Sequence, residues 1–226
     1  IFFFVAVLTK RENLSKYSAL LFALHPVHTE AVAWISATHY LMYPSFFITS
    51  FLFFHFYIHS EEQAPSLYLI SAVFLYFLAL FVTPWAFPLF LIFPLYDILV
   101  CKKKGNVPFY LAILGAVLVF IIVFWGSITS RVYSLSIKQG TPFRNPWFSV
   151  PHSLLEYLKL LVAPLRLTFY HEGKVLTQRY LWTARAVSTL FLAVVPYLAR
   201  KSRVTLFFFL FFFIALAPSL SPIQVA

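Results

Sequence analysis

Long apolar runs, separated by short polar and basic segments, constrain this sequence more than any other feature. The longer runs are Leu41–Tyr57, Leu67–Val82, Trp85–Val100, Pro108–Trp125, Tyr180–Ala199 and Val204–Leu216, and shorter ones lie at Ile1–Leu8 and Tyr17–Leu24. A helix crosses a bilayer core with roughly 20 apolar residues, which keep their backbone hydrogen bonds within the helix. Of 226 residues, 62% are hydrophobic and 11% are charged, whereas soluble domains average about 25% charged residues. The sequence therefore predicts an all-α, polytopic integral membrane protein.

Three short clusters hold much of the positive charge, and each lies between apolar runs: Lys10–Lys16, Lys102–Lys104 and Arg200–Arg203. Loops retained in the cytoplasm carry such an excess of Lys and Arg. If each run crosses the membrane once, the three clusters fall on one side, which we expect to be the cytoplasmic side of a bacterial inner membrane or an ER membrane. The net charge of +10 is thus dispersed. No continuous basic face is left for a nucleic acid, so that class of partner is excluded.

Residues 126–179 form a long polar and amphipathic stretch, and the crossing count places it outside the membrane, opposite the basic clusters. We expect a single membrane domain over residues 1–226 with this stretch as its outer loop. Ser153 and Glu156 have the spacing of a capping box, which predicts an amphipathic helix near residues 152–165. An apolar stripe on such a helix is typical of a segment that lies in the membrane interface.

Three arginines of this loop are candidates for binding a phosphate group: Arg131, Arg144 and Arg166. Arginine holds phosphate oxygens with two parallel hydrogen bonds, which suits an anionic lipid headgroup. The alternative is that long loops are translocated whatever their charge, in which case these arginines need no ligand.

The segment ALHPVHTEAVAWIS, residues 23–36, brings two histidines, a proline and a glutamate into apolar surroundings. Pro26 disfavours helix at His25 and suits the first turn of a new helix. The sequence therefore predicts that one helix ends near Leu24 and another begins at Pro26. Glu30 then lies in the early turns, where the helix dipole favours a negative charge. This local account competes with a catalytic one.

A metal held jointly by His28 and Glu30 is not expected, because residues two apart on a helix point about 200° away from each other. A divalent metal held by His25 and a residue from elsewhere stays open as an alternative, and the sequence requires no other cofactor. The single cysteine, Cys101, excludes an internal disulfide and makes a cysteine-based zinc site implausible.

Four stretches together resemble one family. LHPVHTEAVAWIS resembles the signature of the polytopic protein O-mannosyltransferases that carry C-terminal TPR repeats, and of their bacterial relatives. FPLFLIFPLYDILV, LLEYLKLLVAPLRL and SPIQVA resemble stretches that follow it there, in the same order. The resemblance covers residues 18–226.

The resemblance implies a GT-C-like helix bundle that takes a sugar, by analogy mannose, from a polyprenyl- or dolichyl-phosphate donor. It implies transfer on the outer or lumenal face to Ser or Thr of a protein acceptor, with membrane lipids as further partners. Glu30, His28 and His25 become the candidate catalytic residues, and cationic groups would stabilise the departing lipid phosphate.

The sequence departs from the family pattern in two ways. The first outer loop and its main acidic residue are expected upstream of Ile1, so this fragment is expected to be inactive alone. Residues 37–40, Ala-Thr-His-Tyr, stand where the family tends to have a Gly-Arg-Ala-Asp-like stretch. The rival hypothesis is a non-enzymatic transporter, a flippase for lipid-linked intermediates, or an assembly scaffold. An acidic pair in an outer loop upstream would favour the transferase.

Overall fold

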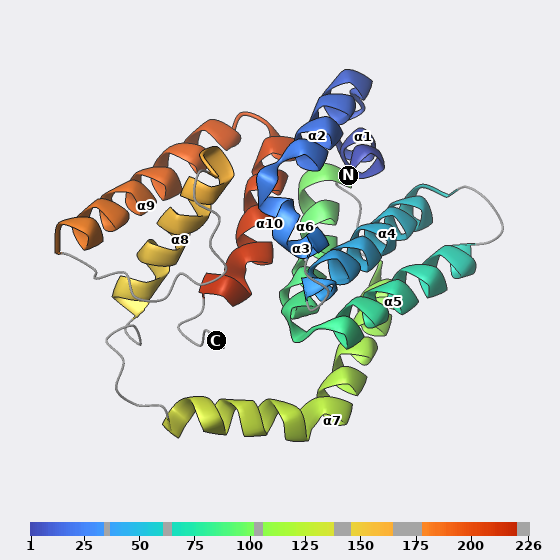
Figure 1. The fold of residues 1–226 in the computed structure, drawn as a ribbon. Helices are drawn as coiled ribbons and strands as arrows, with labels where there is room; N and C mark the ends of the chain where they lie inside the picture. The colour runs from blue at the N-terminus through green and yellow to red at the C-terminus, as the bar shows by residue number, and fades with distance from the viewer. Residues whose placement is uncertain (34–36, 61–64, 102–105, 138–145, 165–177, 221–226) are drawn as a thin grey trace. The chain divides into compact units, whose positions relative to one another are not determined.

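The computed structural model describes residues 1–33, 37–60, 65–101, 106–137, 146–164 and 178–220. Its α-helices are α1 (Phe2–Thr9), α2 (Glu12–Leu24), α3 (Thr29–Ala33), α4 (His39–His59), α5 (Pro65–Val82), α6 (Ile92–Tyr96), α7 (Val107–Ile137), α8 (Pro146–Val162), α9 (Gln178–Ala199) and α10 (Arg203–Leu220) (Figure 1). Between them lie the 3-10 helices η1 (Pro26–His28) and η3 (Pro84–Leu91) and the π-helical turn η4 (Asp97–Cys101). The described residues form helices and no strand, which confirms the all-α prediction.

Four helical segments of the described residues are long and apolar enough to cross a membrane: His39–His59, Pro84–Cys101, Val107–Gly126 and Arg203–Leu220. Ser66–Val82 is apolar but shorter. The expected crossing at Tyr180–Ala199 forms helix α9, which is not one of these four segments. Helix α2 has 13 residues and measures about 20 Å, less than the roughly 30 Å of a hydrocarbon core.

Contacts divide the chain into two compact units, Ile1–Trp125 and Gly126–Ala226. In the first unit, α4 packs along α5 (Figure 1). Small residues permit this close approach: Ala72 and Ala79 of α5 are fully buried, and the Ser50 hydroxyl of α4 donates to the Ala72 carbonyl at 2.5 Å. Few glycines are needed where alanine and serine supply the small surface.

Aromatic rings fill the core of the first unit. Phe54 of α4 stacks on Phe109 of α7 with ring centroids 4.2 Å apart, and it meets Phe93 of α6 edge-on at 5.1 Å. Phe51 contacts Tyr96 edge-on at 4.9 Å. Phe47, Phe51 and Phe54 recur at intervals of four and three residues, so they share one face of α4.

The segment Pro84–Leu91 forms a 3-10 helix with Pro88 inside it. Hydrogen bonds of a 3-10 helix have poorer geometry than those of an α-helix, and proline contributes no N–H. The buried Tyr76 of α5 supplies a donor here: its hydroxyl reaches the Ala86 carbonyl at 3.4 Å and the Phe87 carbonyl at 3.0 Å. Within an apolar core, this side chain satisfies backbone groups of an irregular segment.

In the second unit, α8 packs on α9 and both contact α10. The Ser188 hydroxyl donates to the Pro151 carbonyl at 3.2 Å, which links α9 to α8. The apolar residues of α8 differ in burial: Leu154 and Leu155 are buried, whereas Leu161 and Val162, near the end of the helix, are exposed.

Two predicted boundaries in the second unit differ from the structure. The amphipathic helix begins at Pro146, so Ser153 lies inside α8 and not at its N-cap. Proline is well suited to the first position of a helix, which explains the earlier start. The outer loop was expected to begin at Gly126, yet α7 continues to Ile137. A single glycine costs a helix roughly 1 kcal/mol, which is too little to end it.

Candidate functional site

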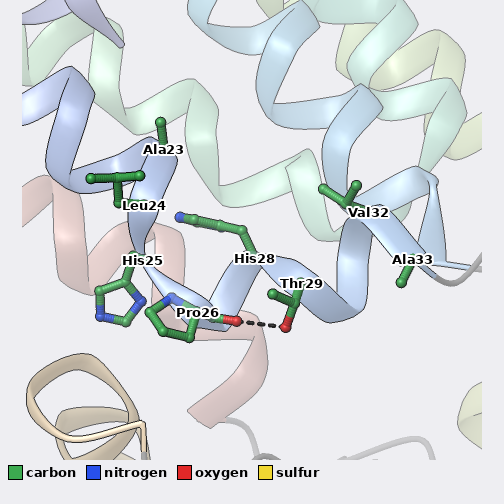
Figure 2. Close-up of a pocket in the computed structure, with 8 residues that line it drawn as sticks. All are labelled: Ala23, Leu24, His25, Pro26, His28, Thr29, Val32 and Ala33. Atoms are coloured by element: carbon green, nitrogen blue, oxygen red, sulfur yellow. Dashed lines mark hydrogen bonds between the residues drawn. The ribbon is translucent and has the colours of Figure 1, made fainter.

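The break between α2 and α3 is built as the sequence predicts. Helix α2 ends at Leu24, His25 is extended (φ −70°, ψ 122°), and Pro26 opens η1. The His25 side chain has a role that the sequence did not reveal: its Nδ1 accepts a hydrogen bond from the Val27 N–H at 3.3 Å, so it caps the new helix. The Thr29 hydroxyl donates to the Pro26 carbonyl at 2.7 Å (Figure 2). These bonds satisfy backbone groups at the break.

The two imidazoles line an open cleft of about 340 Å³ with apolar neighbours. Its lining residues are Ala23, Leu24, His25, Pro26, His28, Thr29, Val32 and Ala33. Figure 2 shows the His28 ring reaching back toward the end of α2, while the His25 ring points away from it. The His28 ring packs against Phe22 with centroids 4.0 Å apart, and its centroid lies 6.2 Å from that of His25.

Burial lowers the pKa of His28 below its usual value of 6.5, and the electrostatic effect of the neighbouring His25 lowers it further. Burial disfavours the charged imidazolium, and a second positive charge acts in the same direction. At neutral pH the His28 ring is therefore uncharged, so it can both donate and accept a hydrogen bond. A neutral imidazole suits proton transfer with a hydroxyl group better than it suits phosphate binding.

The other predicted site residues are placed less fully. Glu30 lies in α3, two residues after His28, but its side chain is outside what the structure describes. Arg131 lies in the last turns of α7, again without a described side chain. Arg144 and Arg166 lie outside the described residues altogether. The structure thus brings His25 and His28 together and leaves the placement of the other four side chains as predictions.

A polar cluster lies between α8 and α9, and the sequence predicts only part of it. Glu156 was recognised, but its partners were not: it accepts hydrogen bonds from the Tyr180 hydroxyl and from Lys159 Nζ, the latter at 3.0 Å. Lys159 also lies over the Tyr180 ring, 4.7 Å from its centroid, and the His152 ring is 5.5 Å from it. Tyr180 belongs to α9, more than twenty residues away, so no local spacing in the sequence pointed to it.

Two further polar contacts lie in the first unit, within apolar helices. The Tyr110 hydroxyl donates to Asp97 Oδ2, and Asp97 is 2% exposed. His55 Nδ1 lies 2.6 Å from the Tyr96 hydroxyl oxygen. Ionisable residues inside apolar helices are the sequence signal for such contacts, because they are costly to bury without partners.

Among the described residues, no group of three or more His, Cys, Asp or Glu side chains is placed to hold a metal ion. At His25 the Nδ1 lone pair accepts from the Val27 N–H, so in the neutral ring the proton sits on Nε2. That arrangement leaves no ring nitrogen to bind a metal while the cap is intact. The comparisons with known proteins identify no relative: no family model, no curated protein and no solved structure matches this chain.

Proposed function

We propose that this chain is the central membrane portion of a GT-C-type glycosyltransferase that uses a polyprenyl- or dolichyl-phosphate sugar donor, with mannose as the sugar and protein Ser or Thr as the acceptor. The observation that carries the proposal is the sequence run LHPVHTEAVAWIS, whose described part, residues 24–33, forms a helix break lined by two imidazoles. Four apolar helical segments of spanning length support the membrane setting.

In this proposal the cleft at the break receives the acceptor hydroxyl. Neutral His28 orients that hydroxyl, and Glu30 is the nearest carboxylate in sequence that can accept its proton. His25 holds the break in shape by capping η1. Arg131, Arg144 and Arg166 are the proposed contacts of the donor phosphate, where positive charge would stabilise the leaving group.

Transfer by the full-length gene product tests the activity. Membranes from cells expressing it would be given a polyprenyl-phosphate sugar carrying radiolabelled mannose and a Ser/Thr-rich peptide. We expect labelled peptide from the unchanged protein, a loss of at least tenfold in His28→Gln and Glu30→Gln, and no loss in the control His39→Gln. Transfer undiminished in Glu30→Gln would remove Glu30 from the site. No transfer by the unchanged protein to any acceptor would favour the transporter, flippase or scaffold hypothesis.

The proposal places the basic clusters Lys10–Lys16, Lys102–Lys104 and Arg200–Arg203 in the cytoplasm and the cleft on the opposite face. This orientation requires that the short α2 takes the chain across the membrane and that the break at His25 and Pro26 lies at its outer end. Cys101 is the single cysteine, so Cys101→Ser provides a background for reporter cysteines. A membrane-impermeant maleimide should label Thr29→Cys from outside intact cells, and Ser202→Cys only after lysis. Labelling of both from one side would refute the orientation.

A further inference from the structure

Two histidines near the end of α4 have a spacing that the residues of the helix break lack. His55 and His59 are one turn apart, and His59 is the last residue of the helix. Their ring centroids are 4.2 Å apart with planes inclined by 31°. Imidazoles four residues apart on one helix face can bind the same metal ion. A tetrahedral metal needs its two nitrogens about 3.3 Å apart, within reach of small side-chain rotations here.

Hydrogen bonds fix which nitrogen of His59 is available. Its Nδ1 lies 2.9 Å from the His55 carbonyl oxygen. A carbonyl only accepts, so His59 Nδ1 carries the proton and the lone pair is on Nε2. Metal-binding histidines commonly donate their other N–H to a backbone carbonyl in this way, which fixes both tautomer and ring orientation.

His55 is compatible with the same tautomer. Its Nδ1 lies 2.6 Å from the Tyr96 hydroxyl oxygen, which can act as the acceptor. His55 Nε2 then has a lone pair as well. The contrast with the helix break is direct: there His25 Nδ1 accepts from an N–H, and the rings of His25 and His28 are 6.2 Å apart.

Exposure suits a site that solvent can reach. His59 is exposed and His55 is partly buried, with its ring also beside that of Tyr96 at 5.9 Å between centroids. The described residues provide no third protein ligand, so water would complete the coordination. Imidazole nitrogens suit zinc, copper and nickel, not magnesium or calcium.

We propose that His55 and His59 form a two-imidazole binding site for a divalent transition metal of the zinc class at the C-terminal end of α4. Tyr96 is a positioning residue that holds the His55 ring through Nδ1. Bound metal would tie the last turn of α4 together and, through Tyr96, fix it to α6. The site is distinct from the cleft at His28 and does not depend on the transferase proposal.

Zinc binding to the purified chain tests the site. The protein would be prepared in detergent with an affinity tag that contains no histidine, and Zn²⁺ would be titrated in by calorimetry. We expect one ion per chain, binding at least tenfold weaker in His55→Gln and in His59→Gln, and unchanged binding in His39→Gln, which alters the same helix at its other end. Equal binding by all four proteins, or no binding by the unchanged chain at millimolar Zn²⁺, would overturn the proposal.

Cobalt provides a second readout that folding defects do not imitate. Co²⁺ bound by imidazole nitrogens gives visible absorption bands, which should appear for the unchanged chain and vanish in His59→Gln, an exposed position where the fold is retained. For Tyr96→Phe we expect a roughly 10-fold loss of Zn²⁺ affinity with unchanged helical circular dichroism, because residues that hydrogen-bond a metal-binding histidine typically contribute about 10–100-fold to affinity. Unchanged affinity in Tyr96→Phe would remove its positioning role, and bands that persist in His59→Gln would overturn the site.

Discussion

Removing the Tyr110 hydroxyl should destabilise the first unit by a measurable amount. Asp97 is 2% exposed, and the Tyr110 hydroxyl donates to its Oδ2. Tyr110→Phe keeps the ring that packs beside Phe109, with centroids 5.8 Å apart, and deletes the donor. A hydrogen bond to a charged group contributes about 1.5–3 kcal/mol. For a chain of this size the midpoint of thermal unfolding should fall by roughly 3–12 °C.

The matched control is Tyr57→Phe. The Tyr57 ring also stacks near Phe109, at 6.3 Å, and the structure shows no hydrogen bond from its hydroxyl to a described residue. Its loss should change stability by less than about 0.5 kcal/mol. Both variants would be measured in the same detergent by the loss of folded protein on size-exclusion chromatography after heating.

A double variant separates the hydrogen bond from packing. Replacing a buried polar pair entirely by apolar residues is often neutral, whereas removing one partner leaves the other unsatisfied. Asp97→Leu combined with Tyr110→Phe should therefore be more stable than Tyr110→Phe alone. If Tyr110→Phe has the same unfolding midpoint as Tyr57→Phe, or if the double variant is less stable than Tyr110→Phe, the hydroxyl does not stabilise Asp97 and the reasoning is refuted.

Three other outcomes follow from the contacts described. Ala72→Leu should destabilise the α4–α5 packing by about 1–3 kcal/mol, measured as above, because the residue is fully buried; an unchanged midpoint would contradict the close packing. The pKa of His28, followed by NMR, should lie below 6.5 and rise in His25→Asn, which keeps a capping side chain without a titratable ring; a value above 6.5 would refute its burial. Because that pKa is lowered in the folded state, the chain should lose stability as the pH falls below 6.5. Tyr180→Phe should lower the free energy of unfolding by about 1–3 kcal/mol, because it removes a hydrogen-bond donor to Glu156. Tyr197→Phe, at an exposed position of the same helix, is the control and should leave the unfolding midpoint unchanged.

Local chemistry made some of the structure predictable from sequence. The break at Pro26 followed from the backbone restrictions of proline, and the end of α2 at Leu24 matches the prediction. The spacing of Ser153 and Glu156 predicts a helix start near residue 152, but α8 begins at Pro146, a proline start signal seven residues before Ser153. A capping spacing and a proline can each mark the start of a helix, and the sequence alone does not show which of the two marks it here.

The polar contacts between helices were not predictable in the same way. The His55–Tyr96 and Tyr180–Glu156 contacts join residues 41 and 24 positions apart. Their formation depends on which helices pack together and on the rotation of each, and helical periodicity does not give either. The capping spacing in the sequence singles out Glu156, but it does not indicate Tyr180 as its partner.

The contact between Tyr76 and the segment Pro84–Leu91 has a consequence for how such sequences can vary. The hydroxyl donates to the carbonyls of Ala86 and Phe87 in a stretch that Pro88 helps to keep from forming a regular α-helix. Loss of the tyrosine is harmful only while the segment stays irregular. Related chains should therefore exchange Tyr76 and Pro88 together, with phenylalanine at the first position accompanying a helix-forming residue at the second.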